Sequence, residues 1–316
     1  MTLRLARTHI PLLATIAVFV LLCGAASLRY RGFCSWPVFR NLVTDNAFLG
    51  IAAIGMTFVI LAGGIDLSVG AMIGFTSILI AKLTAQQVHP LLASTVAVIV
   101  GTGLGACMGG VIRFLALPAF LVTLAGMFLI RGLAFVISLE AIPIKHEFYR
   151  AINDFSLRTL PVVTVVFLIA VAAAIYLAHY TRFGRNVYAI GGNEQSALLM
   201  GLPVGWTKVG LYALSGCCSS VAGVVYTLYT SSGNPSAGTM LELDAIAAVV
   251  IGGTLLSGGV GYVFGTLVGV LILGVIQTII IFEGTLSDWW TKIAVGALLL
   301  VFILLQRLLQ TRAAGK

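Results

Sequence analysis

GMTFVILAGGIDLSVGA, residues 55–71, places a glycine pair and a carboxylate inside a long apolar run. Gly63 and Gly64 allow backbone conformations that other residues resist, so a helix can break there. Asp66 follows them, and Ser68 can cap the helix that begins next. The stretch therefore predicts a helix, a break with an acidic cap, and a second helix.

Asp66 has two compatible interpretations. It can satisfy the free N–H groups of the second helix, or the break can line a solute path. If the run crosses a membrane, a solute path is a plausible interpretation. An isolated carboxylate at bilayer depth is costly and usually faces a cavity or a partner.

The rest of the chain is equally apolar. Of its 316 residues, 60% are hydrophobic and only 9% are charged, and the mean hydropathy is +1.11. An ordinary soluble domain is about 25% charged. This composition excludes a cytosolic enzyme, a disordered protein and a secreted disulfide scaffold. The net charge of +8 comes from dispersed residues, which favours membrane flanks over nucleic-acid binding.

Ten apolar segments predict an all-α polytopic membrane protein with about ten transmembrane helices, forming a single domain over 1–316. They cover about 10–28, 47–62, 67–83, 91–112, 118–138, 160–180, 207–229, 243–256, 260–281 and 288–307. The segments 47–62 and 243–256 are short and run into Gly-rich breaks, which is typical of discontinuous helices. An even number of spans and basic termini predict that both the N- and the C-terminus are cytoplasmic.

A second Gly-rich break, GGTLLSGG at 252–259, echoes the first in spacing, with Leu255 at the place of Asp66. Transporters often carry two broken helices in related halves. Arg131, the other charge inside a span, can snorkel, pair with an acid such as Asp66, or line a pathway. The candidate pathway residues are Gly63, Gly64, Asp66, Ser68, Arg131, Gly252, Gly253 and Ser257.

Glycines also recur at every fourth position in two ladders, 101–109 and 261–269. Small residues on one helix face let two helices approach closely. The ladders predict either packing inside the chain or a dimer seam.

The polar segment 181–206 predicts a short helix from about Asn193 to Met200. Asn193 is a plausible N-cap, and Glu194 lies in the first turn, where the helix dipole favours an acid. Gly201 can end the helix. Such a helix is either an ordinary surface element or a docking element for a soluble partner.

The sequence contains no P-loop, no H-E-x-x-H and no G-x-S-x-G. We therefore expect no enzyme activity, no cofactor and no metal site in this chain. An ion-coupled secondary carrier or channel for small polar solutes stays open as the alternative to an ATP-driven transporter.

Four segments resemble the permease subunits of bacterial ribose-type ABC sugar importers: GMTFVILAGGIDLSVGA, LPAFLVTLAGMFLIRG, TRFGRNVYAIGGNEQSALLMG and LDAIAAVVIGGTLLSGGVG. The likeness runs from about residue 41 to residue 306. Within that family, NLVTDNAFLGI (41–51), LELDAIA (241–247) and GTLSDWWTKIA (284–294) are most similar to the permease of the galactofuranose importer.

The resemblance implies a bacterial inner-membrane subunit that works in lipid with an ABC ATPase, a second permease in a hetero- or homodimer, and a periplasmic sugar-binding protein. ATP hydrolysis would take place on the ATPase, and no nucleic acid is involved. The segment 191–201 would be the loop that couples the permease to the ATPase. Its candidate residues are Gly191, Gly192, Asn193, Glu194, Ala197, Met200 and Gly201.

Overall fold

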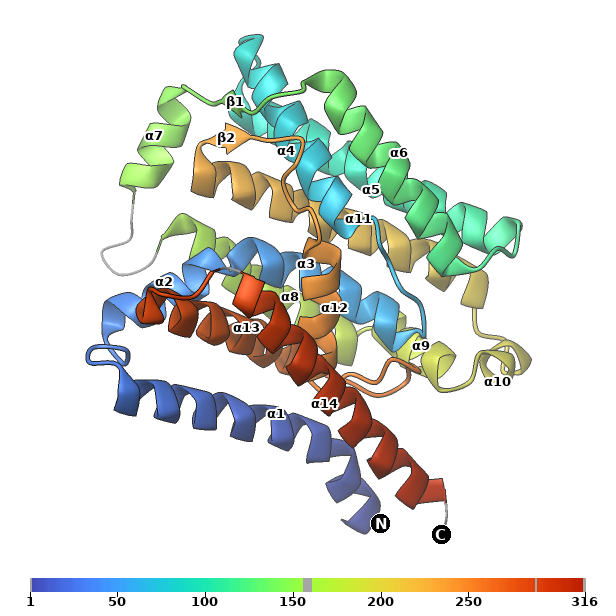
Figure 1. Cartoon of the computed structure of the whole chain (residues 1–316). Helices are drawn as coiled ribbons and strands as arrows, with labels where there is room; N and C mark the ends of the chain where they lie inside the picture. The colour runs from blue at the N-terminus through green and yellow to red at the C-terminus, as the bar shows by residue number, and fades with distance from the viewer. Residues whose placement is uncertain (1, 156–160, 288, 315–316) are drawn as a thin grey trace.

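The computed structural model describes residues 2–155, 161–287 and 289–314, and this part of the chain is helical except for one short strand pair (Figure 1). The helices are α1 (Thr2–Arg29), α2 (Trp36–Asp45), α3 (Ala47–Leu61), α4 (Val69–Ala85), α5 (Pro90–Phe114), α6 (Ala119–Ile137), α7 (Glu147–Asp154), α8 (Val162–Tyr180), α9 (Arg182–Gly192), α10 (Glu194–Leu199), α11 (Val204–Thr230), α12 (Leu241–Ile251), α13 (Val263–Glu283) and α14 (Trp289–Ala314). The strands are β1 (Ile142–Pro143) and β2 (Ser232–Gly233).

The predicted all-α polytopic fold is confirmed, and each of the ten apolar segments contains a helix. Within the described residues, seven helices are long and apolar enough to cross a membrane. There are eight if α2 and α3, which meet at a bend of 51°, form one span. Full-length spans are thus fewer than the ten apolar segments, because the Gly-rich breaks leave α4 with 17 residues and α12 with 11.

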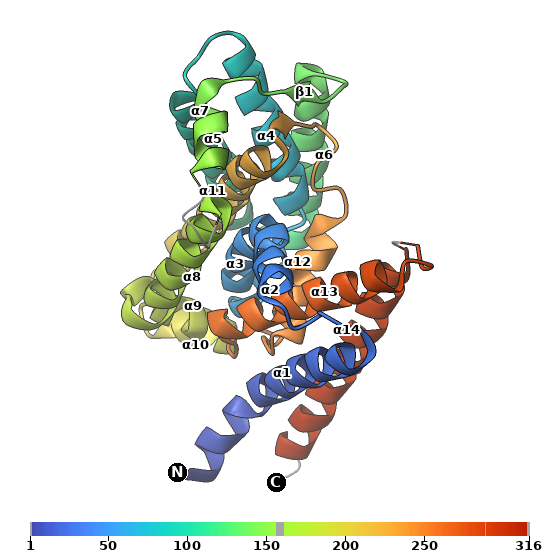
Figure 2. The same ribbon diagram turned by 90° about the vertical axis from the view of Figure 1, so that its left-hand side faces the viewer.

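The core is built around α3 and α11. Almost every residue of α3 is buried, as expected of a helix that is apolar on all sides. The helix α11 packs against α5, α3 and α4. By contrast, α1 and α14 lie at the edge of the bundle beside α13 (Figure 2). The breaks that follow α3 and α12 contain both buried and exposed residues: Asp66 and Gly258 are buried, whereas Gly63 and Ser257 are exposed.

Both glycine ladders pack inside the chain, which confirms the first of their two interpretations. Gly105 of α5 lies against the backbone of Tyr212 and Gly216 in α11. Gly265 of α13 lies against the carbonyl group of Gly252, at the end of α12. A side chain at either glycine would overlap these backbones, so the ladders set the spacing of two helix pairs.

Besides the predicted α10, three helices lie outside the ten apolar segments: α2, α7 and α9. The hydroxyl of Thr181 starts α9 by accepting a hydrogen bond from the N–H of Gly184 at 3.1 Å. The strands β1 and β2 pair antiparallel, with Ile142 opposite Gly233. This pairing ties the segment after α6 to the segment after α11.

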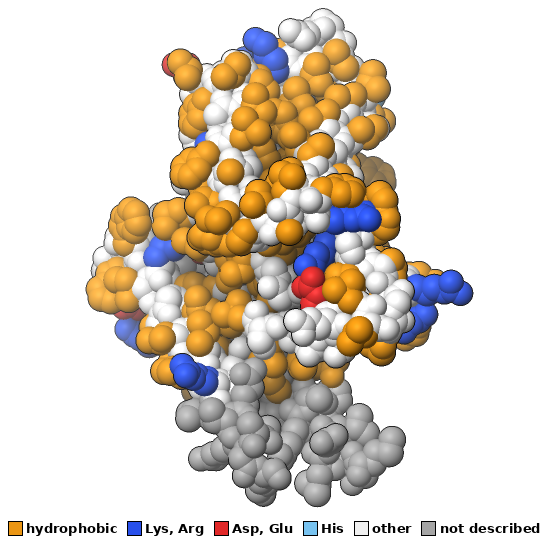
Figure 3. Space-filling view, turned by 90° about the vertical axis from the view of Figure 1, so that its right-hand side faces the viewer, with side chains coloured by type: hydrophobic (Ala, Val, Ile, Leu, Met, Phe, Trp, Pro, Cys, Tyr) orange, Lys and Arg blue, Asp and Glu red, His pale blue; other side chains and the backbone are white. Residues whose placement is uncertain are grey.

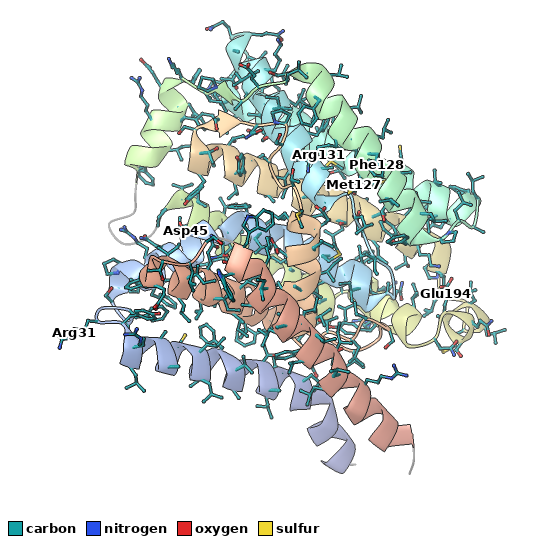
Figure 4. The ribbon with its side chains drawn as sticks, in the orientation of Figure 1. Arg31, Asp45, Met127, Phe128, Arg131 and Glu194 are labelled. Carbon is teal, nitrogen blue, oxygen red and sulfur yellow. The ribbon has the colours of Figure 1, made fainter. Side chains whose placement is uncertain are left out.

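The helices mark two opposite ends of the molecule. The helix α10, the first turns of α1 and the last turns of α14 lie toward one end, and α2, α7 and β1 lie toward the other (Figure 1). Glu194 and Asp45 mark these opposite ends (Figure 4).

Candidate translocation and coupling site

Asp66 is buried, with 1% of its surface exposed, in the break between α3 and α4. One carboxylate oxygen, Oδ1, accepts hydrogen bonds from the N–H of Ser68 at 2.9 Å and from its hydroxyl at 2.6 Å. The other, Oδ2, accepts a hydrogen bond from the hydroxyl of Ser215 in α11 at 2.6 Å. The carboxylate therefore joins two residues within the break, and it also joins the break to α11.

The prediction that the side chain of Ser68 caps α4 is wrong. Ser68 stands at the N-cap position of α4, but its side chain accepts no hydrogen bond from that helix. Its hydroxyl instead donates to Asp66, because the buried carboxylate is a stronger acceptor at close range. Asp66 in turn accepts one N–H at this helix start, which fits the capping interpretation in part.

The two Gly-rich breaks and the end of α9 meet at one place, which we call the glycine junction: Leu61, Gly63, Gly191, Gly258 and Gly259. The N–H of Gly259 donates to the carbonyl oxygen of Leu61 at 2.8 Å. Gly191 lies directly against both groups, and a Cβ atom there would overlap the Leu61 oxygen. Gly63 turns the chain with a φ of +78°, which favours glycine.

The two breaks are similar in spacing but differ in structure. The first is short, and α4 begins at Val69, directly after Ser68. In the second, Gly252 ends α12 and Gly253 turns the chain with a φ of +89°. Ser257 is exposed, and α13 begins only at Val263. The second break is thus a longer loop without a counterpart of the Asp66 anchor.

Arg131 extends from α6 across α4 at Gly74, where a side chain would overlap the guanidinium group. Its Nη1 donates hydrogen bonds of 2.7 Å to the carbonyl oxygens of Pro235 and Ala237. Figure 4 shows its position on α6. The pairing with Asp66 that the sequence left open is not formed, because the hydrogen bonds of Asp66 go to Ser68 and Ser215.

The short helix predicted from about Asn193 to Met200 is present as α10. The side chain of Asn193 accepts a hydrogen bond from the N–H of Ser196 at 2.8 Å, and Gly201 follows the helix with a φ of +77°. Ala197 is buried in a small apolar cluster with Ile190 and Val204. The predicted N-cap and helix end are therefore confirmed.

The opposite side of α10 faces outward. Leu199 is 90% exposed and Met200 is 67% exposed. Lys208 of α11 forms an ion pair of 2.6 Å with Glu194, which fixes the first turn of α10 to α11. The arrangement presents apolar side chains beside charged ones at the surface.

A cavity of about 510 Å³ separates α10 from the loop between α5 and α6. It is lined by Gly63 and Gly64 from the first break, by Glu194 from α10, and by Lys208 and Tyr212 from α11. Asp66 is not among its lining residues. The glycines of the first break therefore line the cavity. Asp66 anchors the break without lining the cavity.

The face at this end is mostly apolar, with basic side chains next to an acidic one (Figure 3). Arg113 stacks over Trp206, with its guanidinium carbon 3.9 Å from the ring centre. Its Nη1 is buried and has no hydrogen-bond partner in the described part of the chain. No group of three or more His, Cys, Asp or Glu side chains in the described residues could hold a metal ion.

Sequence reasoning missed Ser215 and Leu61, two partners in this region. Ser215 lies in an apolar helix 149 positions from Asp66, so no local pattern links them. Leu61 contributes only a backbone carbonyl, which any residue type could provide.

The long apolar helices fit an integral membrane protein, and comparison with known proteins assigns the chain to a permease family. A permease family described as branched-chain amino acid transport system / permease component matches residues 38–303. The chain belongs to this family of ABC transporter permeases. It is an inner-membrane protein, and in this family the ATPase is a separate subunit.

Three similar relatives are bacterial permeases. The inner membrane ABC transporter permease protein YjfF of Escherichia coli is 51% identical over 95% of this chain and 93% of its own length. The fructose import permease protein FruG of Bifidobacterium longum is 35% identical over 96% and 92%. The ribose import permease protein RbsC of Escherichia coli is 37% identical over 92% and 91%, which confirms the resemblance to ribose-type permeases. No solved structure matches this chain.

Proposed function

We propose that this chain is the permease subunit of an ATP-driven sugar importer and forms the translocation pathway with a second permease. Two of its relatives are named as ribose and fructose import permeases, which supports a sugar as the solute. The likeness of 41–51, 241–247 and 284–294 to a galactofuranose permease favours that sugar or a related monosaccharide.

The partners in this proposal are an ABC ATPase, which docks on α10, and a periplasmic sugar-binding protein at the opposite end. Both termini are then cytoplasmic, since α1 begins and α14 ends on the α10 side (Figure 1). The whole chain acts as one membrane domain.

The glycine junction carries this proposal. Gly191 lies in the last turn of α9, two residues before the cap of α10, and it contacts the carbonyl group of Leu61 and the N–H of Gly259. Because these atoms are already in van der Waals contact, displacement of α10 by an ATPase would move both breaks together. Packed interfaces transmit such shifts because they have little free volume.

The pathway candidates take different roles in this mechanism. Gly63 and Gly64 border the cavity beside α10, and Gly252, Gly253 and Ser257 belong to the second break. Asp66 and Ser68 position the first break, and Arg131 positions the 235–237 loop. ATP binding and hydrolysis on the partner would shift the permeases between outward- and inward-open states, with no covalent chemistry on the sugar.

A double variant, Glu194→Arg with Met200→Glu, tests the coupling assignment. We expect loss of ATP-driven sugar uptake in proteoliposomes that contain the complete transporter, and less ATPase retained on the purified permease. Full uptake with normal ATPase binding would contradict the assignment. Uptake driven by an ion gradient in vesicles without the ATPase would instead favour a secondary carrier.

A further inference from the structure

A second cavity, of about 500 Å³, lies at the end of the molecule opposite α10, and we call it the Asp45 pocket. Five helices contribute polar side chains to it: Asp45 from α2, Tyr229 from α11, Asp244 from α12, Gln277 from α13 and Lys292 from α14. Its volume is within the ~300–1,000 Å³ typical of small-molecule sites.

Its charged groups are held in place. The hydroxyl of Tyr229 donates to Oδ1 of Asp45 at 3.0 Å. The amine of Lys292 donates to both carboxylate oxygens of Asp244, at 2.8 and 2.6 Å. Asp45 and Lys292 are exposed at this end of the molecule, so their charged groups are accessible to a polar ligand in the pocket.

An amide completes the polar side. Asn46 is 7% exposed, and its Nδ2 donates to the carbonyl oxygen of Leu42 at 2.9 Å. Its Oδ1 accepts no hydrogen bond from the described residues, so this oxygen is available as an acceptor in the pocket that Asn46 lines. An amide oxygen accepts hydrogen bonds, and a ligand hydroxyl can donate one to it.

The apolar side is aromatic. Phe48 lines the pocket, and its ring centre is 6.4 Å from that of Tyr229 and 5.8 Å from that of Tyr226. Leu241, Leu273 and Val295 form a buried apolar lining. Rings on one side and convergent polar groups on the other are typical of a site for a small polyhydroxylated ring.

The three segments that single out the galactofuranose-type likeness converge on this pocket. Segment 41–51 supplies Asp45, Asn46 and Phe48; segment 241–247 supplies Asp244; segment 284–294 supplies Lys292. They lie far apart in the chain, and the fold brings them to one cavity.

We propose that the Asp45 pocket is a monosaccharide-binding site of this permease, which accepts the sugar on its way from the binding protein to the cavity beside α10. This inference rests on the proposed function. In this pocket the carboxylates accept hydrogen bonds, the ammonium group donates them, and the two amides can donate and accept. These groups match sugar hydroxyls, because each hydroxyl can also donate and accept a hydrogen bond.

Gln277→Ala is the sharpest variant, because Gln277 is exposed and its side chain has no hydrogen-bond partner in the described residues. Gln86→Ala is its control, since Gln86 is an exposed glutamine outside the pocket. Asp45→Asn is a second variant that keeps the side-chain shape. Each is reconstituted as the complete transporter, and radiolabelled D-galactose, D-ribose and D-fructose are offered on loaded binding protein.

The readout is sugar transported per ATP hydrolysed, which separates sugar handling from docking. For the transported sugar, we expect the ratio to fall about tenfold in Gln277→Ala and in Asp45→Asn, and to stay at the wild-type value in Gln86→Ala. A wild-type ratio in both pocket variants overturns the site. Less second permease co-purified with either variant, with a wild-type ratio in the transporter that does assemble, assigns the pocket to assembly and also overturns the site. Wild-type transporter without ATP-driven uptake of any of the three sugars overturns the proposed function, and the site with it.

Discussion

The carboxylate of Asp66 accepts a hydrogen bond of 2.6 Å from the hydroxyl of Ser215. This bond joins the break between α3 and α4 to the middle of α11. The remaining oxygen of Asp66 is used by Ser68, so the acid is satisfied inside the protein. Asp66 therefore orders a break that its glycines alone would leave free.

Replacement of Ser215 by alanine tests this anchor. Loss of the hydroxyl leaves Oδ2 of Asp66 buried without a partner, which costs about 1–3 kcal/mol. We expect a lower free energy of unfolding, seen as a lower melting temperature of the purified protein in detergent. Ser219→Ala is the control, because the Ser219 hydroxyl donates only to the Ser215 carbonyl oxygen of its own helix. Equal melting temperatures of the two variants would contradict the anchor.

Gly191→Ala tests the glycine junction. A methyl group at Gly191 would overlap the Leu61 carbonyl oxygen and the Gly259 N–H, so α9 must shift away from the breaks. We expect uptake to fall at least tenfold while the ATPase stays bound, because the docking surface on α10 is untouched. Gly192→Ala is a close control, since nothing lies within 4 Å of a Cβ atom there. If both variants transport equally well, the junction does not transmit the motion.

Arg131→Ala is expected to release the loop that follows β2. Arg131 donates to the carbonyl oxygens of Pro235 and Ala237, and a charged hydrogen bond contributes about 1.5–3 kcal/mol. Amide hydrogen exchange across 234–240 should therefore accelerate about tenfold or more. Arg131→Lys should restore part of the protection, whereas the exposed Arg150→Ala should leave exchange unchanged. Unaltered exchange in Arg131→Ala would show that the loop stays ordered without these hydrogen bonds.

The sequence predicted the features that depend on neighbouring residues. Asn193 and Gly201 bracket α10 because capping acts over three or four positions. The helix α9 was missed because Gly184, Gly191 and Gly192 weaken its intrinsic helix propensity. In the fold, its buried face, with Val187 and Ile190, compensates by packing.

Contacts between distant segments were beyond prediction from one sequence. Asp45, Asp244 and Lys292 each look like an ordinary charge at the end of a span, and only the packing of α2, α12 and α14 brings them to one cavity. The number of full spans was uncertain for a related reason. The length of apolar runs shows how many apolar segments the chain has. Which of these segments form full-length helices depends on the Gly-rich breaks.

The exposed face of α10 leads to the last prediction. Leu199 is 90% exposed, although Ala197 two residues earlier is buried, so α10 has an inner side and an outer side. An exposed leucine on a short loop helix gains free energy when a partner covers it, about 1.5–3 kcal/mol for full burial. Leu199→Glu should therefore reduce the amount of ATPase that co-purifies with the permease about tenfold or more, without lowering its melting temperature. Leu139→Glu, at an 80% exposed leucine just after α6, is the matched control and should leave co-purification unchanged. Equal ATPase recovery from the two variants would mean that the partner docks elsewhere on the permease.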